Sequence, residues 1–362
     1  MSGFIPPAKP LIGDEEREAV DRVLRSGMLA QGPEVKAFEE EFSAHFGLGR
    51  ACVAVNSGTS GLHLGLLSSW VKAGDEVIVP SFTFAATANS VALTGATPVF
   101  ADIEPDSFCL DPAAVEAAIT ERTVGIMPVH LYGHPANMPA LQAIADKHNL
   151  QIFEDAAQAH GASLNGTPVG AFGTFAMFSL YPTKNMTSGE GGMVSAANPQ
   201  VERLLRLYRN QGMEMQYHNE VVGFNARMTE IHAAIGRVQL TKVDAWTKQR
   251  QENAAFLSAN LRGVTPPPVA PGAVHVYHQY TVRVPQDRDG LAKALREEYQ
   301  VGSGMFYPVP NHRLAPFAVS VDLPQTEKAA TECLSLPVHP SLTQDDLERI
   351  VTAVNTLAGA GA

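Results

Sequence analysis

Three short stretches of the chain carry polar residues whose types and order point to one shared chemistry. The first, residues 56–61 (NSGTSG), follows a strand-like run and precedes an apolar helical pattern. Small residues let a backbone approach a ligand closely, and hydroxyl and N–H groups at a helix start bind anions. The plain alternative is an ordinary helix N-cap. Since the run is neither GxGxxG nor a Walker loop, it points away from dinucleotide binding and nucleoside-triphosphate hydrolysis.

The second stretch, residues 153–161 (FEDAAQAHG), places two acids where an apolar strand ends. Glu154 and Asp155 are adjacent, and Gln158 follows three residues after Asp155. A carboxylate at this place can hold a protonated ring nitrogen. The alternative is that Asp155 only caps a following helix.

The third stretch, residues 179–192 (SLYPTKNMTSGEGG), places Lys184 after a buried-looking strand and inside a glycine-rich loop. Apolar surroundings weaken the preference of a lysine for its charged form, and the free amine can form a Schiff base. The alternative is an exposed loop lysine. The three stretches together offer a phosphate cradle, a carboxylate for a ring nitrogen and an imine-forming lysine. These are the needs of pyridoxal 5′-phosphate (PLP).

The elements that must position these residues read as a parallel α/β arrangement. Continuous apolar or β-branched runs predict buried strands at residues 77–79, 98–103, 124–129, 151–153 and 175–180. Between two of them, residues 139–148 have the periodicity of a helix, with Leu141, Ile144 and Ala145 on one face. Alternating strands and helices predict βαβ units, whose ligands sit outside the carboxyl ends of the strands.

The second half of the chain has a different pattern. We predict one or two long helices over residues 228–261, a boundary loop at 263–272 and a strand at 274–284. Helices are predicted at 289–299 and 342–357, the latter with Thr343 as N-cap. With 362 residues, the chain is long enough for two cores. We place a large domain at residues 1–245 and a smaller one at 246–362.

Composition excludes several classes of protein. The net charge of −11 argues against a general binder of nucleic acid or anionic membranes. Cys52, Cys109 and Cys333 lie far apart without metal-ligand companions, so neither a disulfide framework nor a metal site is predicted. The N-terminus does not resemble a signal peptide, and no apolar run reaches the length of a bilayer span. We expect a soluble cytoplasmic protein.

Five longer motifs resemble those of one known family. NSGTSGLHL, PSFTFAATAN, EDAAQAHGA, YPTKNMTSGEGG and GFNARMTEIHAA are similar to motifs of the DegT/DnrJ/EryC1/StrS aminotransferases, and the resemblance covers nearly the whole chain. It implies the α/β architecture of PLP fold-type I: a large domain with a mostly parallel central sheet flanked by helices, and a smaller C-terminal α+β domain. It also implies a homodimer with shared active sites.

The resemblance assigns roles to individual residues. Lys184 matches the Schiff-base lysine, Asp155 the acid facing the pyridine nitrogen, and Gln158 the amide near the phenolic oxygen. Phe84 matches the aromatic residue that packs on the cofactor ring, where offset stacking adds about 0.5–1.5 kcal/mol. The remaining matches are to phosphate contacts: Gly58, Thr59, Ser60 and Ser179 from the same chain, and Asn225 from the other subunit.

The implied reaction is transamination. L-glutamate would give its amino group to a nucleotide-linked keto sugar in deoxyaminosugar biosynthesis, a branch of secondary metabolism, and dTDP-4-keto-6-deoxy-D-glucose is the first choice. Lys184 favours this reaction over the dehydratase branch of the family, which carries histidine at the position. The alternatives left open are a cyclitol (scyllo-inosose) aminotransferase, a sugar dehydratase and a non-catalytic PLP-binding regulator. No basic helix-turn-helix pattern supports DNA binding.

A diphosphate substrate needs local cations that the acidic chain does not supply globally. The candidates for substrate contacts are Lys9, Arg209, Arg227, Tyr307 and His312. Many relatives have histidine where Phe306 stands, which weakens the inference about contacts at the sugar end. For His278 and His339, structural roles are favoured over ligand contacts.

Overall fold

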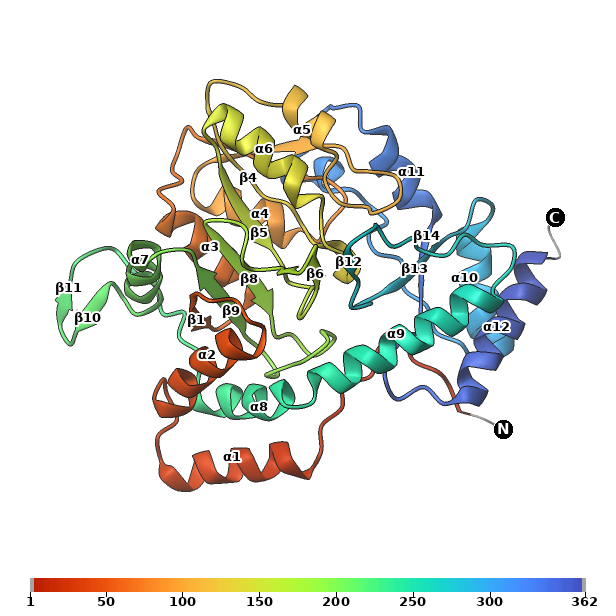
Figure 1. The fold of residues 1–362 in the computed structure, drawn as a ribbon, viewed down its shortest axis with the longest axis horizontal. Coiled ribbons are helices and arrows are strands. Elements are labelled where there is room, and N and C mark those ends of the chain that lie inside the picture. Colours follow the sequence, from red (N-terminus) through yellow and green to blue (C-terminus); the bar gives the residue numbers. More distant parts are fainter. Residues whose placement is uncertain (1–2, 360–362) are drawn as a thin grey trace.

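The central feature of the computed structural model, which describes residues 3–359, is a seven-stranded sheet (Figure 1). Its strand order is β1-β9-β8-β5-β4-β2-β3, and only β9 runs antiparallel to its neighbours. The strands are β1 (Ala51–Val55), β2 (Glu76–Pro80), β3 (Thr97–Ala101), β4 (Thr123–Ile126), β5 (Gln151–Asp155), β8 (Phe175–Ser179) and β9 (Gly192–Ala196). The predicted α/β class with a mostly parallel sheet is confirmed.

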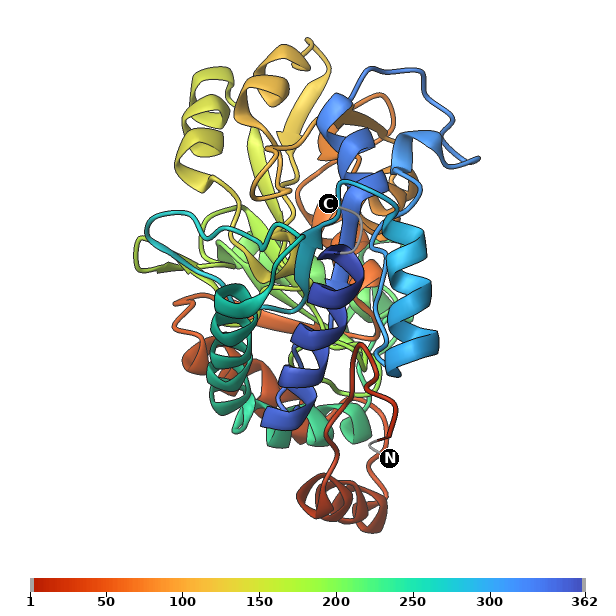
Figure 2. The same cartoon turned by 90° about the vertical axis from the view of Figure 1, so that its right-hand side faces the viewer.

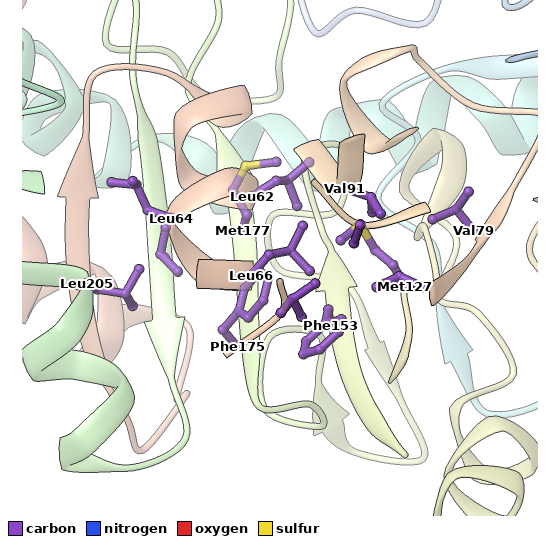
Figure 3. Packing of buried hydrophobic residues seen from close by; sticks show 14 of the residues in the cluster. Leu62, Leu64, Leu66, Val79, Val91, Met127, Phe153, Phe175, Met177 and Leu205 are labelled. Atoms are coloured by element: carbon purple, nitrogen blue, oxygen red, sulfur yellow. The ribbon is translucent and has the colours of Figure 1, made fainter. Parts of the chain in front are cut away.

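Helices cover both faces of the sheet because its strands bury side chains on both sides. Phe175 and Met177 of β8 pack with α3 (Gly58–Ser68), α4 (Ala86–Leu93) and α7 (Pro199–Arg209), as Figure 3 shows in part. Ala176 and Phe178 of the same strand point the other way, toward α2 (Pro33–His45) and α8 (Glu230–Leu240). This alternation follows from the two-residue period of a strand. Beyond β4, α5 (Pro112–Ala117) and α6 (Met138–His148) continue that second layer.

The strands predicted for the large sheet are found at the expected places, but one strand was missed and another prediction was wrong. β9 was not predicted, and it is the strand that breaks the parallel pattern. The strand predicted at 274–284 is wrong as a single element. It is broken into β12 (Ala273–Val274) and β13 (Tyr280–Arg283), and Tyr277 between them has a φ of 45°. A backbone in the left-handed region cannot continue a strand.

A second core gathers the C-terminal elements (Figure 2). It joins α9 (Val243–Asn260), β13, β14 (Cys333–Leu336), α10 (Arg288–Tyr299) and α12 (Gln344–Gly359), together with Ile5 from the N-terminal segment. The helix predictions for this half are confirmed, and Thr343 accepts a hydrogen bond from the backbone of Asp346 at 3.2 Å. The division at 245/246 remains a proposal. In the second part, α11 (Pro324–Glu332) packs Ala329 and Ala330 on the core of the large sheet.

The N-terminal helices are fixed to α8 through buried carboxylates. α1 (Asp14–Ser26) packs on α8 through Ala19, Val23 and Ala234. Glu230, at the start of α8, accepts hydrogen bonds from the backbone N–H groups of Gly32, Glu34 and Val35 at 2.8–2.9 Å. Those are orphan donors at the N-terminus of α2, so the side chain of one helix caps another.

The remaining elements are small. β6 (Ser163–Leu164) and β7 (Thr167–Pro168) form a three-stranded sheet with β12, and there are 3₁₀ turns η1 (Leu131–Gly133) and η2 (Asn311–Arg313). A hairpin of β10 (Met213–Met215) and β11 (His218–Asn219) projects from α7, at the left of Figure 1. Within residues 3–359, no helix combines the length and apolar character needed to cross a membrane.

Candidate active site

The polar residues singled out in the sequence meet at one edge of the central sheet. Asp155 ends β5, Ser179 ends β8, and the loop carrying Phe84 follows β2. β5 and β8 are adjacent and parallel, with Asp155 opposite Met177. Carboxyl ends of parallel strands share an edge, which is where α/β sheets place their ligands. The predicted gathering of these residues is therefore present in the structure.

Asp155 is buried and held by two donors. Its Oδ2 accepts a hydrogen bond from Thr87 Oγ1 at 2.7 Å, and its Oδ1 accepts one from the Ala157 N–H at 3.2 Å. Burial raises the pKa of this carboxyl, while Thr87, Ala157 and the nearby Lys184 amine act in the opposite direction. No helix starts in residues 156–162, so Asp155 is not a helix cap.

The neighbouring acid, Glu154, has a structural role. Its carboxylate accepts backbone N–H groups from Gly170, Phe172 and Gly173 at 2.8–2.9 Å, and it lies 3.1 Å from Nε2 of His130. Because the Ala136 N–H donates to Nδ1 of His130, the ring proton sits on Nε2 and points at Glu154. These contacts fix the 170–173 loop. The two acids thus point in opposite directions, as successive residues of a strand do.

Lys184 is half-buried in the loop after β8. Burial lowers the pKa of its amine to about 8, and Asp155 only partly offsets that effect. Two buried histidines, His160 and His278, interact electrostatically with Lys184. Their pKa values are lowered mainly by burial and further by the charge of Lys184. A lysine in these surroundings supplies a neutral amine near physiological pH. The alternative of an exposed loop lysine is not supported.

The start of α3 lies against the end of β8. A Cβ at Gly58 would stand 3.3 Å from Ser179 Oγ and 3.1 Å from Met177 Sδ, so a larger residue there would crowd the contact between the two segments. Ser57 caps the helix by accepting the N–H of Ser60 at 3.1 Å. Backbone N–H groups of the first turn, with the hydroxyls of Thr59, Ser60 and Ser179, form a donor set suited to a phosphate.

Gln158, Tyr307 and Phe84 form a connected group near Asp155. Gln158 accepts the Tyr132 N–H at 2.7 Å and donates to the Tyr307 hydroxyl at 3.1 Å. The Tyr307 ring lies 6.1 Å from that of Phe84, which is 59% exposed despite its size. Tyr307 belongs to the C-terminal half, so the predicted substrate residue does reach the site. Burial raises the pKa of its hydroxyl.

These residues fit PLP in the chemistry of their donors. The Gly58 cradle and its hydroxyls suit the phosphate, the buried Asp155 carboxylate suits a protonated ring nitrogen, and the Lys184 amine suits the aldehyde. An aromatic ring left 59% exposed at Phe84 offers a stacking surface. Within the described chain, no group of three or more metal-binding side chains occurs.

Other predicted residues lie at the margin of this cluster. Asn225 is exposed, and the neighbouring Ala226 carbonyl accepts the Asn56 N–H at 2.9 Å, so this segment runs beside the start of α3. Arg227 is half-buried and donates to Asn210 at 3.0 Å. Lys9 is exposed in the N-terminal segment.

Two predicted substrate residues need correction. Arg209 is buried and bonded to Glu39 at 2.5 Å and to the Ala54 carbonyl, so it belongs to an internal ion pair. His312 is 2% exposed, and both of its ring nitrogens have protein partners. Neither is available to a diphosphate. His339 is likewise engaged at both nitrogens, by Pro6 and Ser341, which supports its structural role.

Comparisons with known proteins now settle the family. The model of the DegT/DnrJ/EryC1/StrS aminotransferase family matches residues 10–355. The chain belongs to this family. It is 43% identical to the dTDP-3-amino-3,4,6-trideoxy-alpha-D-glucose transaminase of Streptomyces venezuelae, over 95% of this chain and 92% of the relative. The predicted class of enzyme, a transaminase, is thereby confirmed.

Two further relatives are named for different functions. The chain is 40% identical to the UDP-N-acetyl-3-dehydro-alpha-D-glucosamine 3-aminotransferase of Acidithiobacillus ferrooxidans, over 96% of this chain and 95% of the relative. It is 41% identical to a "pleiotropic regulatory protein" of Geobacillus stearothermophilus, over 94% and 93%.

Solved structures agree with the fold. The crystal structure of S. venezuelae DesV in complex with a ketimine intermediate is similar with a TM-score of 0.93 and 40% identity, over 98% of this chain and 99% of that one. A structure of NtdA from Bacillus subtilis with bound cofactor PMP has a TM-score of 0.92 and 28% identity, over 99% and 86%.

The sequence did not single out every residue that shapes the site. Thr87 holds Asp155 and lies within the motif PSFTFAATAN, three residues after Phe84, but nothing in its spacing reveals the contact. Tyr132, whose hydroxyl donates to the Phe306 carbonyl, and Asn311 were also missed. Both act across more than 100 residues of sequence, a distance over which periodicity carries no signal.

Proposed function

We propose that the protein is a PLP-dependent aminotransferase that moves an amino group from L-glutamate to a nucleotide-linked keto sugar. The observation that carries the proposal is the Lys184 amine, with its pKa lowered to about 8, beside the buried Asp155 carboxylate at the carboxyl edge of the sheet. Family membership and the PMP-bound neighbour support the choice of cofactor.

Different residues would bind each group of the cofactor. Gly58, Thr59, Ser60 and Ser179 would bind the phosphate, and Phe84 would pack on the ring. Asp155, supported by Thr87, would keep the ring nitrogen protonated, and Gln158 would face the phenolic oxygen. When bound, PLP supplies an aldehyde that receives the amino group and a ring that stabilises negative charge on the donor carbon.

Proton movement falls to Lys184. When Lys184 is not bonded to the cofactor, its Nζ would accept the proton from the Cα of the amino donor. A general base acts in this way when its pKa lies near the working pH. The same Nζ would then give up that proton as the amino group leaves the donor. With the keto sugar, the same proton transfers would occur in the reverse order. Burial favours the neutral form of this amine, and the Asp155 carboxylate only partly offsets that effect.

The acceptor is the finer part of the proposal. dTDP-4-keto-6-deoxy-D-glucose is the first substrate to test, on the resemblance of the sequence to 4-aminotransferases. A 3-keto sugar is a second candidate, because two relatives that share 40–43% of their residues with this chain are named for a 3-amino or 3-dehydro sugar.

One incubation separates these candidates. Purified protein loaded with PLP is mixed with L-glutamate and, in parallel, with the 4-keto sugar, a dTDP-3-keto sugar and scyllo-inosose, and the products are identified by mass and NMR. An amino sugar formed with one acceptor assigns the substrate. No conversion of any acceptor by the wild-type protein would contradict the proposal and favour the regulator named among the relatives.

We also propose a homodimer in which Asn225 of one subunit completes the site of the other. Asn225 and nearby Val222 are exposed, the latter 90%. The test mixes two inactive variants, Lys184→Ala and Asn225→Ala. If the site is shared, each mixed dimer contains one intact site and activity returns. If both residues serve the same chain, mixing restores nothing.

A further inference from the structure

The loop that carries Phe84 is held by residues more than 220 positions later in the chain. Asn311 donates from its side chain to the Thr83 carbonyl at 2.9 Å and from its backbone to the Ser81 carbonyl at 2.9 Å. His312 makes two contacts with one atom, Ser81 Oγ: its backbone N–H lies at 3.0 Å and its Nδ1 at 2.7 Å. The loop 81–84 is therefore fixed at both its backbone and its first side chain.

The hydrogen bonds define the form of the His312 ring. The backbone N–H of His312 donates to Ser81 Oγ, and the Glu327 carboxylate that faces Nε2 can only accept a hydrogen bond. The ring therefore carries a proton on Nε2, and in the neutral ring with that proton Nδ1 accepts the Ser81 hydroxyl. Nε2 faces Glu327 Oε1 at 2.9 Å, which makes that hydrogen bond charge-assisted. One buried side chain therefore connects the loop to Glu327.

Glu327 is itself well placed, because α11 is anchored to the central sheet. Asp102, directly after β3, accepts the N–H groups of Gln325 and Thr326 at 2.9 and 2.8 Å in the first turn of α11. Figures 1 and 2 both show α11 (blue) lying beside segments of the large sheet and its helices (orange). Hydrogen bonds thus connect the end of β3 to α11, α11 to His312, and His312 to the loop 81–84.

We propose that His312 is a positioning residue that fixes the loop 81–84 and so sets the place of Phe84 at the cofactor ring. The role of Phe84 rests on the proposed function. His312 acts only through Ser81, since it is 2% exposed and does not reach the site. The same loop carries Thr83, which lies 3.1 Å from Thr87, the residue that holds Asp155. Displacing the loop would therefore disturb both the stacking ring and the acid.

The test measures amide hydrogen exchange of residues 81–87 in the cofactor-free chain, and then the affinity for pyridoxamine phosphate. His312→Ala should speed exchange of this segment about tenfold and weaken pyridoxamine phosphate binding to a similar degree. His312→Asn keeps an acceptor for Ser81 and should give an intermediate rate. Arg313→Ala is the matched control: it removes the exposed partner of the same Glu327 oxygen and should leave both values at the wild-type level.

If His312→Ala matched Arg313→Ala in exchange and affinity, the proposal would be overturned. Should His312→Ala fail to fold, Ser81→Ala removes the loop side of the same contact. Faster exchange confined to residues 81–87 would then support the proposal, and wild-type exchange would reject it. The exchange measurement uses no cofactor, so it stands even if the proposed function fails. Unchanged exchange with intact transaminase activity would reject only the role of His312.

Discussion

Lys184 connects the local electrostatics of the site to its chemistry. Burial lowers the pKa of its amine to about 8, and only the neutral amine attacks an aldehyde. The rate of PLP capture by the cofactor-free chain should therefore rise with pH and level off above about 8. Stopped-flow absorbance between pH 6.5 and 11.5 measures this rate.

The carboxylate of Asp155 provides the control for this titration. Asp155→Asn removes the charge that raises the pKa of Lys184, so the midpoint should move to lower pH. A midpoint near the ordinary lysine value of 10.5 in the wild-type protein would show that burial does not tune this amine.

Thr87 is expected to support Asp155 from α4. Thr87→Val removes the 2.7 Å hydrogen bond to Oδ2 and leaves a buried carboxylate oxygen without that partner, which costs about 1–3 kcal/mol. A cost of this size in the transition state would lower kcat by about 5- to 150-fold, since 1.4 kcal/mol corresponds to a factor of ten. Thr87→Ser, which keeps the hydroxyl, should retain most of the rate. Equal rates for Thr87→Val and wild type would remove Thr87 from the site.

At the scale of single residues, sequence reasoning placed side chains correctly where they stand at or just after the end of a buried strand. Asp155 and Lys184 follow such strands and were found by type and spacing, whereas Thr87 contacts Asp155 from 68 residues away. His312 was wrongly predicted to face the substrate, because a histidine gives no sign in sequence of whether its two nitrogens are already bonded.

Among the secondary-structure elements, the cap that joins α8 to α2 has the clearest energetic consequence. Glu230 accepts three backbone N–H groups of the first turn of α2. Glu230→Ala should lower the free energy of unfolding by roughly 2–4 kcal/mol, because three donors lose a charged acceptor. Urea unfolding measures the change.

Glu34→Gln is the matched control for that experiment. It alters a carboxylate in the same turn whose ion pair with Arg237 is partly exposed, so its effect should stay below about 1 kcal/mol. A loss for Glu230→Ala no larger than that of Glu34→Gln would contradict the capping role.

The elements themselves were predictable to the extent that their patterns are local. Continuous apolar runs gave the buried parallel strands β2, β3, β4, β5 and β8. β9 was missed because its short run follows a glycine-rich loop and its pairing with β1 and β8 is antiparallel and non-local. The break between β12 and β13 depends on the left-handed backbone conformation of Tyr277. A tyrosine rarely adopts that conformation, so the sequence does not indicate it.

The whole molecule should be sensitive to acid, because it buries neutral histidines. Burial lowers the pKa of His160 and of His275 to about 3, from an ordinary 6.5. The unfolded chain binds these protons first, so their contribution to stability is complete above pH 6.5 and is lost as the pH falls below it. Between pH 6.5 and 5 the loss should be roughly 2 kcal/mol for each histidine.

Urea unfolding at a series of pH values measures this slope. His275→Gln should make it shallower, while His218→Gln, which changes an exposed histidine of β11, should not. An identical slope in wild type and His275→Gln would exclude His275 as a source of the acid sensitivity.

The most direct test of the account concerns one covalent bond. Protein loaded with PLP is reduced with borohydride, digested and examined by mass spectrometry, with Lys184→Ala as the control. We expect the reduced cofactor on the peptide that contains Lys184, and none in the variant. An adduct on another lysine, or no adduct in protein that is saturated with PLP, would contradict the central claim.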